Sequence, residues 1–173
     1  TILIIIGILA ALVAAAGMMY NPVSYARRNL HSNNTMARYH AVWTLAMLND
    51  RKSTPEIRKL MHDEDQYIRR NAIMALGDFD DRESIPQIRE LLKYDNSTTV
   101  RGEAMRVLTR FGDKESVPEI RKMLESKDYN ILYEAIYALI KFDDKESAPI
   151  IQKVLDDDRR DIRVLAVSAL GTL

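Results

Sequence analysis

The feature that most constrains the fold of this chain is a repeat of 31 or 32 residues. Alanines recur at this interval, and four of them have a proline 14 residues later. The alanines are Ala41, Ala72, Ala104, Ala135 and Ala166, and the prolines are Pro55, Pro86, Pro118 and Pro149. A repeat of this length predicts a solenoid, in which each unit buries its apolar face against its neighbours.

Within each copy, the spacing of apolar residues predicts two helices. In the longer one, Ile68, Ala72, Leu76 and Phe79 fall on a single helical stripe. The shorter one begins with Ser-x-Pro and continues with apolar residues at helical spacing, such as those from Ile88 to Leu92. Each copy is therefore expected to be a helix pair.

The start of each shorter helix carries a capping signature. A serine followed three residues later by Glu or Gln predicts a capping box, here with Ser53 and Glu56, Ser84 and Gln87, and Ser116 and Glu119. A one-residue insertion between Lys93 and Thr99 predicts that this loop is longer than the corresponding ones.

The recurring motif reads V-R-x-x-A-x-x-A-L and then D-x-x-S-x-P-x-[IL]-x-x-[LM]-[LM], as from Val100 to Leu108 and from Asp113 to Leu124. This motif resembles short HEAT repeats of the phycobilin-lyase-like subtype, and the resemblance covers residues 37–173. It implies an α-solenoid of stacked helix pairs that acts as a protein-binding scaffold. One position departs from the pattern, because Leu132 stands where other copies have Arg69, Arg101 and Arg163. We therefore expect any arginine ladder to be broken at the fourth unit.

The first twenty residues have a different character. Residues 2–19 are all aliphatic, glycine or methionine, and the first charged residue is Arg27. At about 1.5 Å per residue, a helix over 1–20 is roughly 30 Å long, the thickness of the hydrocarbon core of a bilayer. The expected fold is all-α, a single N-terminal transmembrane helix followed by an α-solenoid of about five HEAT-like helix pairs. The expected divisions are a transmembrane helix over 1–20, a juxtamembrane segment with a first short helix over 21–36, and the solenoid over 37–173.

The predicted membrane helix has a stripe of small residues, which permits close packing against other membrane helices. The stripe consists of Gly7, Ala11, Ala14 and Ala15. Aromatic and basic residues suit the membrane interface, and those expected there are Tyr20, Tyr25, Arg27 and Arg28. Because Arg27, Arg28 and Arg38 follow the apolar segment and no acidic residue precedes Asp50, the positive-inside rule favours a single-pass membrane protein with its soluble domain in the cytoplasm.

Composition argues against several kinds of chemistry. The 25 basic and 25 acidic residues balance, so the chain lacks the basic excess typical of nucleic-acid binding. Without cysteine, disulfides and thiolate sites are excluded. His31, His40 and His62 are far apart and have no metal-ligand spacing, and no phosphate-binding loop or hydrolase motif occurs. We therefore expect no catalytic residues, no metal and no cofactor.

The outward positions of the longer helices are the candidate binding residues. Positions two and six of each copy point away from the apolar stripe and carry aromatic and arginine residues, which are enriched at protein-binding hot spots. The candidates are Tyr39, Trp43, Arg70, Met74, Arg106, Tyr133 and Tyr137. The alternative is that these residues pack against a neighbouring helix or at the membrane interface.

These features together predict a non-enzymatic, membrane-anchored scaffold. It would be an accessory subunit that packs into and stabilises a larger integral membrane protein complex, with a soluble protein as a further partner. A second hypothesis is a pilin-like filament subunit, because residues 6–11 resemble the N-terminal helix of type IV pilins. Thr1 and Ile5, however, differ from the Phe or Met and the Glu of that family. A third hypothesis is an enzyme subunit related to bilin lyases, which share this type of repeat.

Overall fold

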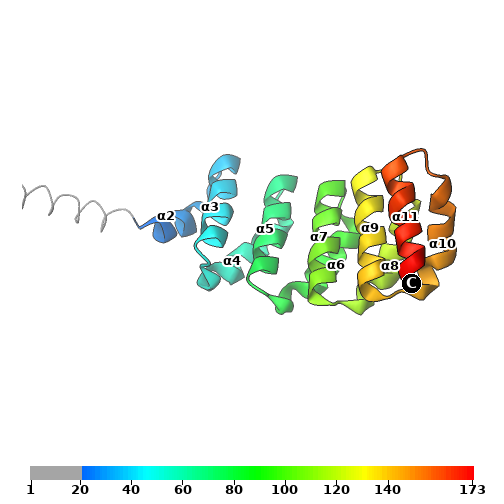
Figure 1. Ribbon diagram of the computed structural model, residues 1–173. Coiled ribbons are helices and arrows are strands. Elements are labelled where there is room, and N and C mark those ends of the chain that lie inside the picture. Colours follow the sequence, from blue (N-terminus) through cyan, green and yellow to red (C-terminus); the bar gives the residue numbers. More distant parts are fainter. Residues whose placement is uncertain (1–20) are drawn as a thin grey trace, which may run out of the picture.

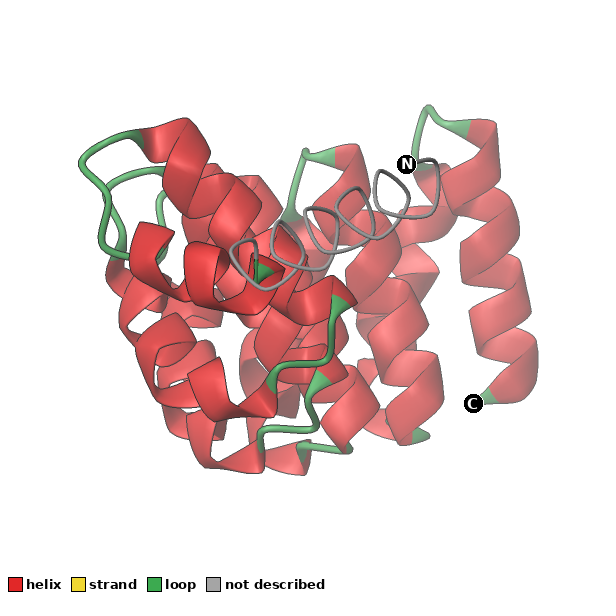
Figure 2. Cartoon of the chain, turned by 90° about the vertical axis from the view of Figure 1, so that its left-hand side faces the viewer, coloured by secondary structure: helices red, strands yellow, loops and turns green. Residues whose placement is uncertain are grey.

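The structure, a computed structural model, describes residues 21–173, which form an α-solenoid of five helix pairs (Figure 1). Each pair has a shorter helix followed by a longer one. The shorter helices are α2 (Pro22–Asn29), α4 (Thr54–Lys59), α6 (Ile85–Tyr94), α8 (Val117–Lys122) and α10 (Ala148–Lys153). The longer helices are α3 (Thr35–Met47), α5 (Gln66–Asp78), α7 (Thr98–Phe111), α9 (Tyr129–Phe142) and α11 (Arg160–Thr172). Figure 2 shows that these residues contain helices and loops and no strand.

The five longer helices stand side by side in chain order and form one layer of the solenoid (Figure 1). Each also packs against the shorter helix of its own repeat, and the apolar core lies between the two sets of helices. The five repeated alanines are at most 2% exposed, because their small side chains let neighbouring helices approach. The residues that recur every 31 or 32 positions in the sequence are thus the ones at which neighbouring helices meet.

Four of the longer helices end in the same turn. The residue after each helix, or the second residue after it, adopts a left-handed conformation with φ between 50° and 70°. These residues are Asn49, Asp80, Gly112 and Asp143. The next amide then bonds to a carbonyl five residues earlier, as in Asp113 N–H to Leu108 O at 3.0 Å. This arrangement satisfies the last turn of the helix and redirects the chain toward the following shorter helix.

The serines that precede the shorter helices do not cap them, so the prediction of capping boxes is wrong. Three of the hydroxyls instead donate to a carbonyl three residues earlier at 2.6 or 2.7 Å, from Ser84 to Asp81, Ser116 to Asp113 and Ser147 to Asp144. The reason lies in the backbone, because each serine ends a 3₁₀ turn and has helical dihedral angles. A capping serine requires an extended conformation.

The one-residue insertion lengthens a helix and leaves the loop unchanged. Helix α6 continues for 10 residues, whereas α4 and α8 each have 6 residues followed by a 3₁₀ turn of 3. An α-helical turn takes more residues than a 3₁₀ turn, so the extra residue is absorbed there. The prediction of a longer loop is therefore wrong.

Arginines of the shorter helices form a first ladder of ion pairs. Each guanidinium makes two hydrogen bonds to an aspartate that follows the longer helix of the same repeat. The Nε–Oδ2 distances are 2.6–2.8 Å in the pairs Arg27–Asp50, Arg58–Asp81, Arg89–Asp113 and Arg121–Asp144. Two-point pairs of this kind fix the orientation of the paired groups as well as their distance. The hydrogen bond from Arg27 lowers the pKa of Asp50 below its usual range.

Arginines of the longer helices form a second ladder, which joins successive repeats. Arg38 holds Asp63 and Arg69 holds Asp95, with Nε–Oδ2 distances of 2.7 and 2.8 Å. Burial raises the pKa of Asp95, but the hydrogen bonds from Arg69 and from the Ser97 amide outweigh it, and the pKa lies below its usual value.

The second ladder is interrupted at Leu132, as the missing arginine predicts. The ladder is already incomplete one repeat earlier, at Arg101. Arg101 donates to the Asp95 carbonyl at 3.1 Å, as Arg69 does to the Asp63 carbonyl. Ser126, however, stands where the next aspartate would be, and the buried Nε of Arg101 has no hydrogen-bond partner within residues 21–173.

Candidate functional site

The predicted binding residues lie on the outer face of the longer helices, which we define as the face carrying positions two and six of each repeat. Trp43 is 48% exposed, Tyr133 40% and Tyr137 43%, and Arg106 is also exposed. The half-buried members are Tyr39, Arg70 and Met74. Because α3, α5, α7 and α9 pack side by side in that order, these residues lie on one face of four repeats, with the exposed aromatic ones on α3 and α9.

The same helices expose further large side chains that the two-position pattern missed. They are Met36, Met47, Tyr67 and Tyr129 on α3, α5 and α9, with Val167 on α11, next to Val164 at position two of the fifth repeat. Tyr129 and Tyr133 stack with ring centroids 6.1 Å apart. Residues in the first helical turn, such as Tyr67 and Tyr129, lie one turn before position two or six, and extending the pattern by one turn would have found them.

A buried carboxylate lies beneath this face. Glu103 of α7 is only 3% exposed; its Oε2 accepts a hydrogen bond from Arg106 at 2.7 Å and lies 3.3 Å from Nε of Arg70 on α5. Burial raises the pKa of Glu103, Arg106 and Arg70 oppose this effect, and Glu134 and Asp78 add to it. The carboxylate therefore orients two arginines from adjacent helices toward the outer face.

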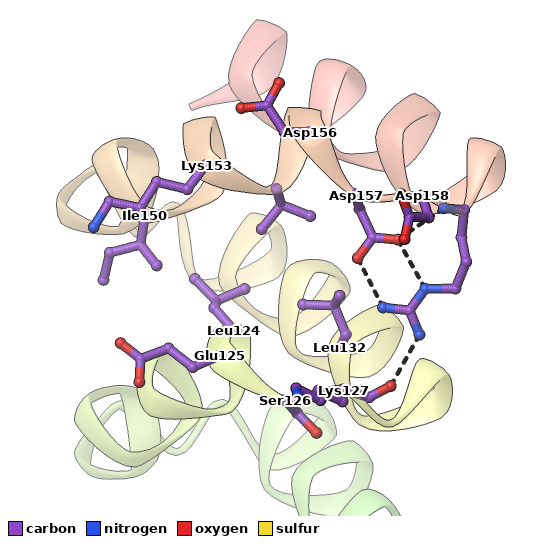
Figure 3. A pocket seen from close by; sticks show the side chains of 12 residues that line it. Leu124, Glu125, Ser126, Lys127, Leu132, Ile150, Lys153, Asp156, Asp157 and Asp158 are labelled. Carbon is purple, nitrogen blue, oxygen red and sulfur yellow. Dashed lines mark hydrogen bonds and ion pairs between the residues drawn. The ribbon is translucent and has the colours of Figure 1, made fainter.

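A pocket of about 610 Å³ lies where the second ladder is broken (Figure 3). Leu124 and Leu132 line it, and the turns before α9 and α11 form its sides. Arg159 reaches from the second turn and holds Asp157 through two hydrogen bonds of 2.8 Å, with a third to the Lys127 carbonyl at 3.1 Å. The hydrogen bonds that Asp157 accepts from the guanidinium and the backbone amide of Arg159 lower the pKa of Asp157 to about 2. We interpret the pocket as the space left by the ladder arginine that Leu132 replaces.

The described residues also place the predicted interface residues that follow the apolar segment. Tyr25 and Arg28 are exposed on α2, and Arg27 forms the first rung of the first ladder. The predicted transmembrane helix over 1–20, with Gly7, Ala11, Ala14, Ala15 and Tyr20, lies outside the described residues. Among residues 21–173, no helix is both long and apolar enough to span a bilayer. The same range contains no group of three His, Asp or Glu residues that could bind a metal ion.

Stacked helix pairs with an exposed aromatic and basic face define this chain as an α-solenoid repeat protein. The family model for HEAT repeats matches residues 26–108 and again residues 90–171. The chain therefore belongs to the HEAT-repeat family. No curated protein matches the sequence.

Several solved structures share the fold. In the complex of CpcE and CpcF of phycocyanin lyase from Nostoc sp. PCC7120, the matching chain is 23% identical with a TM-score of 0.72, and the match covers 87% of this chain and 64% of that one. A designed armadillo repeat protein in complex with the peptide (KR)4 is 16% identical with a TM-score of 0.66, covering 85% and 80%. An engineered protein is 20% identical with a TM-score of 0.68, covering 94% and 81%. Similarity at these identities establishes the fold and nothing more.

Proposed function

We propose that this protein is a non-enzymatic scaffold that binds a protein partner through the outer face of its longer helices. The observation that carries the proposal is the row of exposed aromatic residues, of which Trp43, Tyr133 and Tyr137 are each at least 40% exposed. Large aromatic side chains dominate binding energy at interfaces because they bury much apolar area with few rotatable bonds. Tyr133 and Tyr137 lie one turn apart on α9 and are both exposed, and an exposed patch of such residues marks a binding surface.

The ladders support this role because they hold the helices that carry the outer face in a fixed arrangement. The first ladder continues through four repeats with two-point arginine–aspartate pairs. A preorganised surface loses little conformational entropy when a partner binds, so more of the contact energy appears as affinity. A scaffold benefits from this rigidity.

The finer part of the proposal is that the scaffold is an accessory subunit of a membrane protein complex. Its support is the sequence of residues 2–19, which carries no charged or hydrogen-bonding side chain. Helix α2 begins at Pro22 and Asn21 caps it, so two residues separate the apolar segment from the solenoid. A membrane anchor so close to the repeats would hold the outer face near the bilayer, on the cytoplasmic side if Arg27 and Arg28 follow the positive-inside rule.

A second candidate is a subunit of a two-component bilin lyase. The observation in its favour is the similarity to a chain of the CpcE–CpcF complex, a phycocyanin lyase formed from two proteins. The purified protein would then carry a bound tetrapyrrole or acquire one from solution, and visible absorbance separates this candidate from the scaffold.

The test of the scaffold proposal is affinity purification of the tagged full chain from membranes in mild detergent. We expect components of a membrane complex to co-purify with the wild type and with Tyr94→Ala, a control at an exposed tyrosine of α6. The double variant Trp43→Ala/Tyr137→Ala removes two expected hot spots and should reduce recovery of those components at least about tenfold. Recovery of the wild type only as a free monomer would contradict the proposal.

A further inference from the structure

A groove on the outer face between α7 and α9 suggests what kind of partner segment binds there. Its volume is about 440 Å³, which is enough for one or two side chains of a peptide. The residues that line it are Arg106, Thr109, Arg110, Glu134, Tyr137 and Lys141. Three of the six carry positive charge.

These cations are incompletely neutralised within the part of the chain that the structure describes. Lys141 has no ion pair there, and its ammonium lies 5.4 Å from the centroid of the Tyr137 ring. Arg106 uses one nitrogen for Glu103, and its other N–H groups bond to no described residue. Arg110 pairs with Asp78 at 3.1 Å, but both side chains are about half exposed, where such a pair is weak.

The acids near the groove offset part of this charge: Glu134 lines it, Asp78 pairs with Arg110, and Glu103 pairs with Arg106. Glu103 is buried beneath the face and Glu134 is half-buried. The ten outward positions of the five repeats include two arginines and no acidic residue, although the chain as a whole has equal numbers of acids and bases. The lining of the groove therefore carries three positive charges and one negative charge, beside the Tyr137 ring.

We propose that the groove between α7 and α9 binds an acidic segment of the partner protein, with an Asp or Glu side chain seated among Arg106, Arg110 and Lys141. This inference rests on the proposed scaffold function and specifies its partner. A carboxylate accepts hydrogen bonds from both arginine forks and from the ammonium, and it relieves their mutual repulsion. Apolar residues of the same segment would pack on Tyr133 and Tyr137. The designed armadillo protein in the comparison is in complex with a basic peptide, (KR)4, whose charge is opposite to that of the acidic segment proposed here.

The test uses three fluorescein-labelled probes and the full chain in detergent, with binding followed by fluorescence anisotropy. The probes are the octapeptide (ED)4, the octapeptide (KR)4 and a uridine octaribonucleotide. We expect (ED)4 to bind most tightly of the three and to lose affinity as salt rises, because the attraction is electrostatic. Tighter binding of (KR)4 overturns the proposal, and so does tighter binding of the oligonucleotide.

Two matched substitutions localise the effect. Lys141→Glu reverses a charge in the groove and should weaken (ED)4 binding about tenfold. Lys93→Glu is the control, since Lys93 also lies over a tyrosine ring, that of Tyr94 at 4.9 Å, but on α6. It should change affinity less than about twofold, because Lys93 does not line the groove and salt screens charges that are well separated at the surface. Equal effects of the two variants overturn the assignment to the groove.

The outcome is distinguishable from failure of the scaffold proposal. If co-purifying partners still depend on Trp43 and Tyr137 but (ED)4 does not bind, the scaffold stands and the acidic partner is wrong. If (ED)4 binds with the expected dependence on Lys141, the acidic partner is supported whichever complex contains it.

Discussion

The broken rung at Arg101 can be completed by one substitution, Ser126→Asp. Position 126 already has the backbone of the working rungs: φ and ψ are −71° and 135° at Ser126, −61° and 146° at Asp63, and −65° and 136° at Asp95. The Ser126 hydroxyl also accepts the amide N–H two residues later, at 3.2 Å, as the Asp63 and Asp95 carboxylates do at 2.9 and 2.8 Å. An aspartate therefore fits without any change of the main chain.

The expected gain follows from the unsatisfied donor. A buried group with no hydrogen-bond partner destabilises a protein by about 1–3 kcal/mol, and a hydrogen bond to a charged group removes that penalty. Burying the new carboxylate offsets part of the gain. We expect Ser126→Asp to raise the free energy of unfolding by about 1 kcal/mol, or the melting temperature by roughly 2–4 °C for a chain of this size.

Urea unfolding in a double-mutant cycle provides the assay. In a background of Arg101→Met, which keeps the aliphatic length but removes the guanidinium, Ser126→Asp should give no gain. An equal gain in both backgrounds would refute the rung and assign the effect to the negative charge before the N-terminus of α9. A loss of stability in the wild-type background would refute the geometry.

Four further substitutions test other contacts. Asp95→Ser copies the broken rung into the neighbouring repeat and should destabilise by about 3 kcal/mol, because it leaves the Arg69 guanidinium without its acid; an unchanged urea midpoint would contradict this. A methyl group on Gly77 would displace the Arg110 guanidinium and lie 2.9 Å from Cγ2 of Val107, so Gly77→Ala should destabilise by about 1 kcal/mol, because overpacking outweighs the better helix propensity of alanine. A methyl group on Gly171 would have no atom within 4 Å, so Gly171→Ala should stabilise by up to about 1 kcal/mol. The two variants should therefore shift the melting temperature in opposite directions. Asp157 has a folded-state pKa of about 2, below its unfolded value, so its stabilisation is present above about pH 5 and is lost as pH falls from 4 to 2. Melts at pH 5 and pH 3 should therefore show a smaller drop for Asp157→Asn than for the wild type, and an identical drop would contradict the assignment.

Much of the fold could be predicted because the same pattern of residues recurs in every copy of the repeat. The alanines of each copy align in the sequence and prove to be buried where helices meet, and the loss of arginine at Leu132 marks a break in the second ladder. Such features depend on spacing and side-chain size, which a single sequence displays directly.

Other features depend on local geometry that the residue type does not reveal. The serines before the shorter helices are of a residue type that often caps helices, but their backbone has the conformation of a 3₁₀ turn. Arg159 pairs with Asp157 in place of the ladder arginine that position 132 lacks. It approaches from the other side of the pocket, which no periodic pattern predicts. Glu103 looks in the sequence like a solvated acid, and its burial follows only from how α5 and α7 pack.

The central claim is that a protein partner binds the outer face of the longer helices. The most direct measurement is site-specific photocrosslinking in intact cells, with benzoylphenylalanine replacing Tyr137 on that face or Tyr94 on α6. Tyr94 is the more exposed of the two at 71%, so accessibility alone favours the control. We predict a discrete crosslinked species from position 137 and none from position 94. Crosslinks from position 94 with none from position 137 would contradict the account.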